Sequence, residues 1–237
     1  DPEWDGEPVN VVEGEPQEPK EPKVPKEPQP IPDPPEEPRK RLKIKLRDGK
    51  EREIQHMIST SFWSADGKPI SVQEFIDNMF GAMPEFFKNE EELRKIWSSP
   101  TTRKIFLDKI AELGYGSDEL EALQKMINAE ACDLLDVLSY ISFLTPPISR
   151  ALRVEKAKER IFEGMDKENR EFLDFVLAKY EEKGVEELDE EKLPILLNLK
   201  YHAIANAEQS LGDVNTIRAT FFDFQQNLYL QNVQHEY

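Results

Sequence analysis

The stretch at residues 129–144, AEACDLLDVLSYISFL, is the most apolar in the chain and constrains its fold more than any other segment. From Leu134 to Leu144 its polar residues are Asp136, Ser139 and Ser142, which recur at every third position. On an α-helix this spacing leaves only a narrow polar stripe, so most of the helix surface must contact other protein. A membrane span needs about 20 apolar residues, and this stretch is shorter. The sequence therefore predicts a buried central helix in a mainly α fold.

Amphipathic segments that could surround this helix follow one another across residues 71–230. Residue types that cap helix N-termini precede most of these segments. The predicted caps are Ser71, Ser99, Ser117, Ser149, Asp166, Asp189 and Asp213. Two of these segments are rich in apolar residues. The segment after Asp189 has Leu193, Leu196, Leu197, Leu199 and Tyr201, and the last segment has Val214, Ile217, Phe221, Phe224 and Leu228. We expect a multi-helix bundle around the central helix.

A β-hairpin is predicted before the helices. In LKIKLRDG, which begins at Leu42, apolar and basic residues alternate with the period of a half-buried strand, and the Asp-Gly pair is a strong hairpin signal. We predict a register in which Ile44 pairs with Ile54 and Arg47 with Glu51. This register places the aliphatic side chains on one face and the charges on the other.

The hairpin carries the densest group of cations in the chain. These residues, which we call the hairpin cations, are Arg39, Lys40, Arg41, Lys43, Lys45 and Arg47. They are candidates for DNA contacts, because clustered Lys and Arg bind phosphates. The alternative is a charged strand edge that prevents aggregation. The sequence leaves both interpretations open.

Residues 1–38 have a composition of their own, with 12 of the 18 prolines and a net charge of −9. Such frequent prolines remove backbone donors and fix φ, which favours an extended, disordered, solvated strut. A PxxP ligand for an SH3 or WW domain is the alternative. The chain thus divides into an acidic linker (1–38), a hairpin with an aromatic turn (39–70), a helical domain (71–230) and a tail (231–237).

Composition and motifs exclude several kinds of chemistry. A net charge of −17 is unfavourable for a general polyanion-binding protein. The single cysteine, Cys132, excludes an intrachain disulfide and a four-cysteine zinc site, and we expect a buried, unreactive thiol. The motifs GxxxxGK[ST], GxGxxG, HExxH and GxSxG are absent, and the three histidines are far apart. The residues themselves favour an interaction module over an enzyme.

Several phrases taken together resemble one family. In order, they are DPEWDGEP, TSFWSADGKPIS, VQEFIDNMFG, EACDLLDVLSYISFLTPPISRALRVEKAK, FLDFVLAKYEEKGVEELDEEKLPILLNLKY and IRATFFDFQQNLY. They are similar to the C-terminal region of the R (restriction and motor) subunit of type I restriction endonucleases, over nearly all of residues 1–229. The chain also begins without an initiator Met, which suggests a fragment of a longer protein.

The resemblance implies a helical domain that follows the nuclease and ATP-dependent DNA-translocating domains of the R subunit. It implies docking onto a methyltransferase core of modification and specificity subunits, with DNA met through the complex. ATP, Mg²⁺ and S-adenosylmethionine would then belong to the assembly, and no catalytic, cofactor-binding or metal-binding residue is assigned to this chain. No signal peptide or membrane segment is found, so we expect a cytoplasmic protein without membrane contact.

Two sets of residues are candidates for the docking surface. One is a basic set on the helix that Ser149 begins, and the other is expected to face outward from the last helix. They are Arg150, Arg153, Lys156 and Arg160, and Phe222, Gln225, Gln226 and Tyr229. The alternative to docking for the basic set is a solvated helix face without a partner. The alternative for Phe222 and Tyr229 is that their rings pack in the core. Alternative functions are a domain that guides duplex DNA along the hairpin cations and a generic helical interaction module.

Overall fold

The computed structural model describes residues 41–55, 62–64 and 67–230, which lie in one compact unit of the chain, residues 38–237. Several predictions fall outside the described residues, namely the linker 1–38, the cations Arg39 and Lys40, and the tail 231–237. The described residues form ten α-helices and two short hairpins. The predictions of a mainly α fold and of a hairpin before the helices are confirmed.

The first hairpin pairs β1 (Arg41–Lys45) with β2 (Glu51–Gln55). Leu42 lies opposite Ile54, whereas the predicted partner of Ile54 was Ile44, so the predicted register was wrong by two residues. A shift of two residues keeps every side chain on its predicted face. Ile44 and Ile54 are accordingly both buried.

The turn of this hairpin explains the register. The backbone N–H of Gly49 donates to the oxygen of Leu46 at 2.9 Å, and the N–H of Leu46 donates to the oxygen of Lys50 at 3.1 Å. Gly49 has a φ of +77°, which a residue with a Cβ adopts only at a cost. A three-residue hairpin loop needs this conformation at its last position, so the loop closes with Gly49 there.

Two arginines attach the hairpin to the helices. The side chain of Arg52 is 1 % exposed, and its Nε and Nη2 donate to the backbone oxygen of Ile141 at 3.2 and 2.8 Å. Arg47 Nε lies 2.8 Å from Asp77 Oδ2 on α1 (Val72–Ala82), and not opposite Glu51 as predicted. These contacts join the hairpin to the helices.

The second hairpin is much shorter. It pairs β3 (Phe62–Trp63) with β4 (Pro69–Ile70) just before α1. The ring of Phe62 is buried and stacks on the ring of Phe75 in α1, with 4.3 Å between their centroids. This aromatic contact fixes the start of the helical part against β3.

We call the first five helices, α1 to α5, the first helical group. After α1 and a 3₁₀ turn at Met83–Glu85, they are α2 (Glu90–Trp97), α3 (Pro100–Glu112), α4 (Ser117–Met126) and α5 (Leu134–Phe143). The Ser71 hydroxyl accepts the N–H of Glu74, as predicted for an N-cap, and Ser99 is the N-cap of α3. The prediction for Ser117 was wrong by one residue, because Gly116 is the N-cap of α4.

The predicted central helix is α5, and its burial is confirmed. Leu135, Val137, Leu138 and Ile141 are at most 2 % exposed, and the polar Asp136 and Ser139 are buried as well. The helix begins at residue 134 and not at 129, because Asp133 caps its N-terminus. Neighbours therefore enclose two residues of the polar stripe, and the third, Ser142, is half-buried.

We call the remaining helices the second helical group. They are α6 (Arg150–Phe162), α7 (Lys167–Lys183), α8 (Leu193–Tyr201), α9 (Ile204–Leu211) and α10 (Val214–Tyr229), with 3₁₀ turns at Val185–Leu188 and Glu190–Lys192. The predicted caps Ser149, Asp166 and Asp213 each accept a backbone N–H at a helix start. Asp189 begins the 3₁₀ turn that leads into α8.

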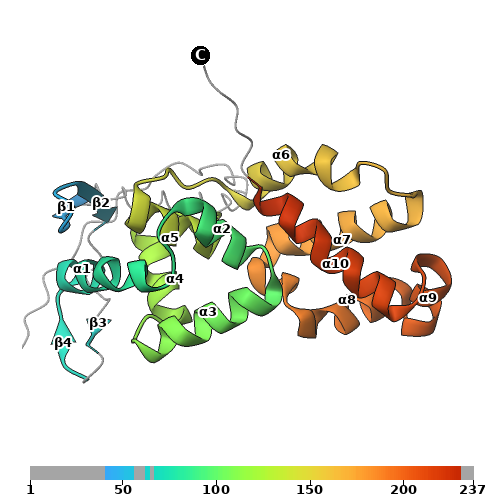
Figure 1. Cartoon of the computed structure of the whole chain (residues 1–237), viewed down its shortest axis with the longest axis horizontal. Coiled ribbons are helices and arrows are strands. Elements are labelled where there is room, and N and C mark those ends of the chain that lie inside the picture. Colours follow the sequence, from blue (N-terminus) through green and yellow to red (C-terminus); the bar gives the residue numbers. More distant parts are fainter. Residues whose placement is uncertain (1–40, 56–61, 65–66, 231–237) are drawn as a thin grey trace, which may run out of the picture. The chain divides into compact units, whose positions relative to one another are not determined.

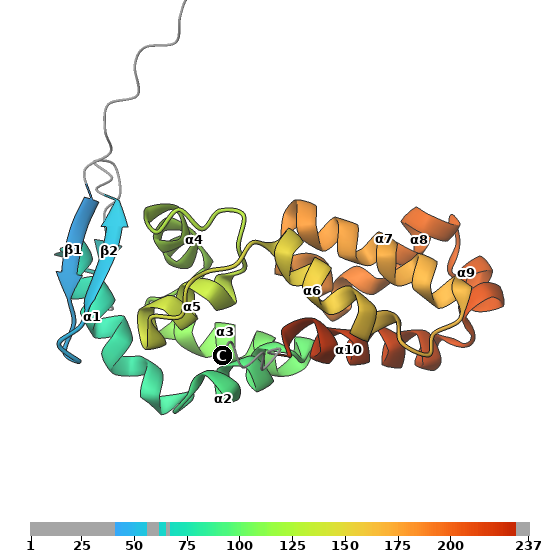
Figure 2. The ribbon, with the colours of Figure 1, turned by 90° about the horizontal axis from the view of Figure 1, so that it is seen from above.

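The two groups of helices lie side by side, as Figures 1 and 2 show, and their buried apolar side chains belong to one hydrophobic core. α5 contacts α1, α2 and α4, whereas α6 to α10 pack mainly on one another. In the last helix the predicted core positions Ile217, Phe221, Phe224 and Leu228 are buried, but Val214 is 45 % exposed. Val214 is the first residue of α10, where no other helix covers it. Between the groups, α2 contacts α10.

Candidate functional site

A cluster of buried polar side chains lies where the two helical groups meet. We call it the junction network, and it consists of Asp133, Asp136, Arg153, Tyr180 and Tyr229. None of these residues is more than 5 % exposed. Ionisable groups are this buried only where partners offset the loss of water, so their partners define what the network does.

The local sequence fixes the two carboxylates of the network. Asp133 is the N-cap of α5, and its Oδ1 accepts the N–H of Leu135 at 3.1 Å. Asp136 Oδ2 accepts the N–H of Asp133 at 3.0 Å in return, which completes a capping box. Both carboxylates therefore lie at the N-terminus of α5, where the helix dipole favours negative charge.

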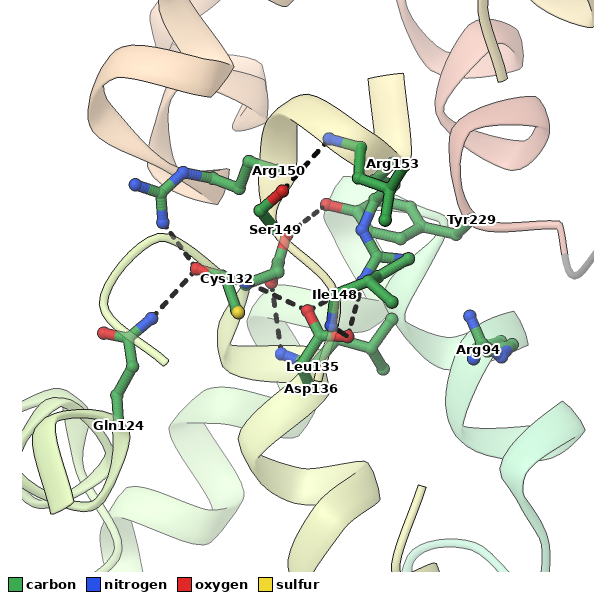
Figure 3. A network of polar contacts seen from close by, with 12 residues as sticks. Arg94, Gln124, Cys132, Leu135, Asp136, Ile148, Ser149, Arg150, Arg153 and Tyr229 are labelled. Atoms are coloured by element: carbon green, nitrogen blue, oxygen red, sulfur yellow. Dashed lines mark hydrogen bonds and ion pairs between the residues drawn. The ribbon is translucent and has the colours of Figure 1, made fainter. Parts of the chain in front are cut away.

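The second helical group supplies the partners of these carboxylates. Arg153 Nη2, on α6, lies 2.7 Å from both carboxylate oxygens of Asp136. The hydroxyls of Tyr180 on α7 and Tyr229 on α10 each donate to Asp133 Oδ2 at 2.8 Å. Figure 3 shows Arg153 and Tyr229 reaching toward the start of α5, where Asp136 lies. One capping box thus binds three helices of the other group.

Burial dominates the electrostatics of the network. It raises the pKa of Asp136 above its ordinary value, and the charge of Arg153 opposes this shift. Burial and the neighbouring charge of Asp133 raise the pKa values of Tyr180 and Tyr229 well above 10.0. Both tyrosines therefore stay protonated and remain donors to Asp133.

A second buried contact joins the groups at Gln225, about one helical turn before Tyr229 in α10. Arg103 on α3 is fully buried, and its Nη1 donates to Gln225 Oε1 at 3.1 Å. Its Nη2 donates to the backbone oxygen of Leu188 at 3.1 Å and lies 2.9 Å from Asp189 Oδ1. Gln225 Nε2 also donates to the oxygen of Leu188, at 3.0 Å. These bonds tie α3 to α10 and to the turn before α8.

Most side chains of the predicted basic set on α6 form hydrogen bonds with other residues of the chain. Arg150 Nη1 donates to the backbone oxygen of Cys132, as Figure 3 shows, and Arg153 binds Asp136. Arg160 Nε and Nη2 donate to the oxygen of Asn227 at 3.1 and 2.6 Å. Among the four predicted residues, Lys156 is the exposed one. Their role in docking stays a prediction.

The outward orientation predicted for the last helix is wrong for two of four residues. Gln225 is 0 % and Tyr229 is 1 % exposed, because their polar atoms pair with Leu188 and Asp133 across the junction. Phe222 is half-buried, and Gln226 is exposed. A docking role of these four residues stays a prediction. Of the four, only Gln226 and part of Phe222 are accessible to a partner on the surface of α10.

Three of the four described hairpin cations have acidic partners. Their ion pairs are Arg41 with Glu53, Lys43 with Glu51 and Glu53, and Arg47 with Asp77. Lys45 is exposed and carries no ion pair within the described part of the chain. These pairs reduce the positive charge available to phosphates, and contact with DNA stays a prediction.

The described part of the chain has a buried cysteine thiol and no cluster of metal ligands. Cys132 is 7 % exposed, and burial raises the pKa of its thiol to about 11, so the expected buried thiol is confirmed. Residues 41–55, 62–64 and 67–230 contain no group of three or more His, Cys, Asp or Glu that could hold a metal. In the same part of the chain, no helix has the length and apolar character needed to cross a membrane.

Sequence reasoning missed an exposed apolar pair on α8. Ile195 is 60 % exposed, and Leu199, one of the apolar positions noted in the sequence, is 58 % exposed. They are four residues apart, so they share one face of the helix. The sequence LPILLNLKY held a signal, because its apolar residues are too many for one buried face.

Taken together, the two helical groups and the junction network define a helical domain held together by buried polar side chains. A family model described as EcoEI R protein C-terminal matches residues 73–229. The chain belongs to this family, the C-terminal domain of the R subunit of type I restriction enzymes. Searches of curated proteins and of solved structures gave no match. The first hairpin lies outside the matched range.

Proposed function

We propose that this domain docks the R subunit onto the methyltransferase core of a type I restriction enzyme, formed by the modification and specificity subunits. Membership of the R-subunit family supports a place in a restriction complex. A folded docking domain avoids much of the cost of ordering a chain on binding. The buried junction network supports this role, since it holds the two helical groups in one arrangement.

The observation that carries this proposal is the apolar pair Ile195 and Leu199 on α8. Three other residues of α8, Leu193, Leu196 and Leu197, are buried and anchor the helix. The pair is therefore held on a fixed helix with more than half of each side chain in water. Exposed apolar side chains that share one face are typical of a surface that a partner covers.

The proposal assigns the cofactors and location as follows. ATP, Mg²⁺ and S-adenosylmethionine bind elsewhere in the assembly and not to this chain. The domain reaches DNA through the complex, which acts in the cytoplasm. The finding that the described residues contain no cluster suited to a metal is compatible with this assignment.

Co-purification of the R subunit with the modification and specificity subunits tests the proposal. The double variant Ile195→Asp/Leu199→Asp should reduce the retained R subunit at least about tenfold, because it places two charges in a contact that excludes water. Ile105→Asp is the matched control, since Ile105 on α3 is also apolar and 50 % exposed. Its retention should equal that of the parent.

A melting curve for each variant establishes that it folds. If the double variant melts like the parent and is still retained in full, the docking face is not on α8. If the control loses retention to the same extent, the contact is not specific to the α8 pair.

A further inference from the structure

The exposed side of α8 carries no charged side chain. We call its residues the uncharged face, and they are Pro194, Ile195, Asn198 and Leu199. Their spacing places them on one side of the helix. The face lies in a stretch of unusual composition, since residues 193–207 contain one lysine and no arginine, aspartate or glutamate, although 33 % of the chain is charged.

The one lysine of this stretch, Lys200, contacts aromatic rings of its own chain. Its Nζ lies 5.4 Å from the ring centroid of Phe175 on α7 and 5.8 Å from that of Tyr201. An ammonium group over an aromatic ring is attracted by the negative face of the ring. Lys200 is half-buried, whereas Ile195 and Leu199 are 60 % and 58 % exposed. The most accessible large side chains of the stretch are therefore aliphatic.

A charged group on a partner would be unfavourable opposite the uncharged face. Covering the face removes water from both surfaces, and a charge that loses its water needs an opposite charge or hydrogen bonds in return. None of the four side chains can supply an opposite charge, and Asn198 is the one that can form side-chain hydrogen bonds. The surface that covers Ile195 and Leu199 must then be uncharged and largely apolar.

Three other occupants fit the uncharged face less well than an apolar protein surface. Nucleic acids and anionic membranes are bound by clusters of Lys and Arg, which the face lacks. A second copy of the chain would bring together two net charges of −17, and like net charges oppose association. The charge pattern thus favours a different protein as the partner.

We propose that the uncharged face of α8 binds an uncharged, apolar patch of the methyltransferase core. The inference rests on the docking role proposed above and adds the chemistry of the partner's surface at the same site. Burial of apolar surface stabilises such a contact, and no ion pair takes part in it. A charge of either sign placed in the contact is therefore unfavourable.

The sign of an introduced charge tests the proposal. Surface plasmon resonance measures the affinity of the whole R subunit for the assembled core of modification and specificity subunits. Leu199→Lys and Leu199→Glu should each weaken this affinity at least about tenfold, because either charge would be buried against an apolar patch. Leu199→Met should stay within about threefold of the parent, since it keeps an apolar side chain of similar volume.

Ile105→Lys and Ile105→Glu are the matched controls. Ile105 on α3 is 50 % exposed, so these variants make the same changes of charge away from α8. Each should keep the affinity within about twofold of the parent, and an effect of net charge alone would appear in them. Melting curves like that of the parent establish that the variants fold.

Opposite effects of the two charges at Leu199 overturn the proposal, because the partner would then carry a charge at this site. Full affinity of both charged variants also overturns it and moves the docking face away from α8. An equal loss in Leu199→Met overturns it too, since charge would not be the cause. In these three cases the parent still binds, so the docking role itself stands. A parent that does not bind the core removes the docking role and this inference together.

Discussion

Asp136 and Arg153 form an ion pair inside the protein, with Nη2 of the arginine 2.7 Å from both carboxylate oxygens and side chains that are only 6 % and 3 % exposed. The aspartate belongs to the first helical group and the arginine to the second. Two charges taken out of water stabilise a fold only while both are present, because either alone is an uncompensated buried charge. The pair therefore makes the two groups depend on each other.

Replacing Arg153 by Met should lower the free energy of unfolding by about 3–5 kcal/mol, since the Asp136 carboxylate would stay buried without its cation. Urea denaturation followed by circular dichroism measures this change. Lys158→Met is the control, because Lys158 is on the same helix but its ion pair is exposed, and it should cost at most about 1 kcal/mol. Equal stabilities of the two variants would contradict the structural role of the pair.

Leu138→Asp should prevent folding of the domain. Leu138 is 0 % exposed in α5, so the new carboxylate would be buried without a partner. Leu199→Asp is the contrasting variant, because Leu199 is 58 % exposed and its replacement should change stability by about 0.5 kcal/mol or less. Thermal melting of both proteins checks this, and a parent-like melting curve for Leu138→Asp would show that α5 is not the enclosed helix described here.

The two tyrosines of the junction network should make the protein sensitive to alkali. Their folded-state pKa values lie above the ordinary 10.0, so the unfolded chain releases their protons first as the pH rises. The stability that they contribute is complete below pH 10.0 and is lost above it. Urea denaturation from about pH 8 to about pH 11 should show this decline, and Tyr229→Phe should make it shallower. An unchanged slope in the variant would count against a raised pKa at Tyr229.

Asp213 should contribute to acid unfolding. Hydrogen bonds to its carboxylate, first from the backbone N–H of Thr216, lower its pKa from 3.8. A lowered pKa means that the stabilisation is present above that ordinary value and is lost as the pH falls through the folded-state pKa. Asp213→Asn keeps a good N-cap without a titrating group, so its stability should decline less steeply in acid. Denaturation curves from about pH 6 to about pH 2 test this, and identical slopes would exclude a contribution from Asp213.

Cys132 should react slowly with thiol reagents in the native protein. Burial raises its pKa to about 11 from 9.0, which reduces the reactive thiolate about 100-fold near neutral pH. Labelling with an aromatic disulfide should therefore be at least about 100-fold slower than in urea, where the thiol is exposed. Cys132→Ser should show no labelling at all. Equally fast labelling with and without urea would mean that the thiol is accessible.

Four helix starts were predicted correctly because their caps are made by neighbours in the chain. Ser71, Ser149, Asp166 and Asp213 cap helices as predicted, because the bonds of a cap join residues two or three positions apart. The hairpin register was not predictable from alternation alone, since two registers place the same side chains inward. The conformation that Gly49 adopts at the end of the loop selected the observed one.

The sequence by itself determined the mainly α fold and the enclosure of α5, because hydrophobic periodicity depends on residues a few positions apart. Only the tertiary structure decided that Arg153 and Tyr229 face inward and that Leu199 faces water. The bonds of the junction network that cross between the groups join residues 17 to 96 positions apart, and no local pattern encodes which polar group will meet another at that separation. Burial of these groups follows from how the two helical groups meet.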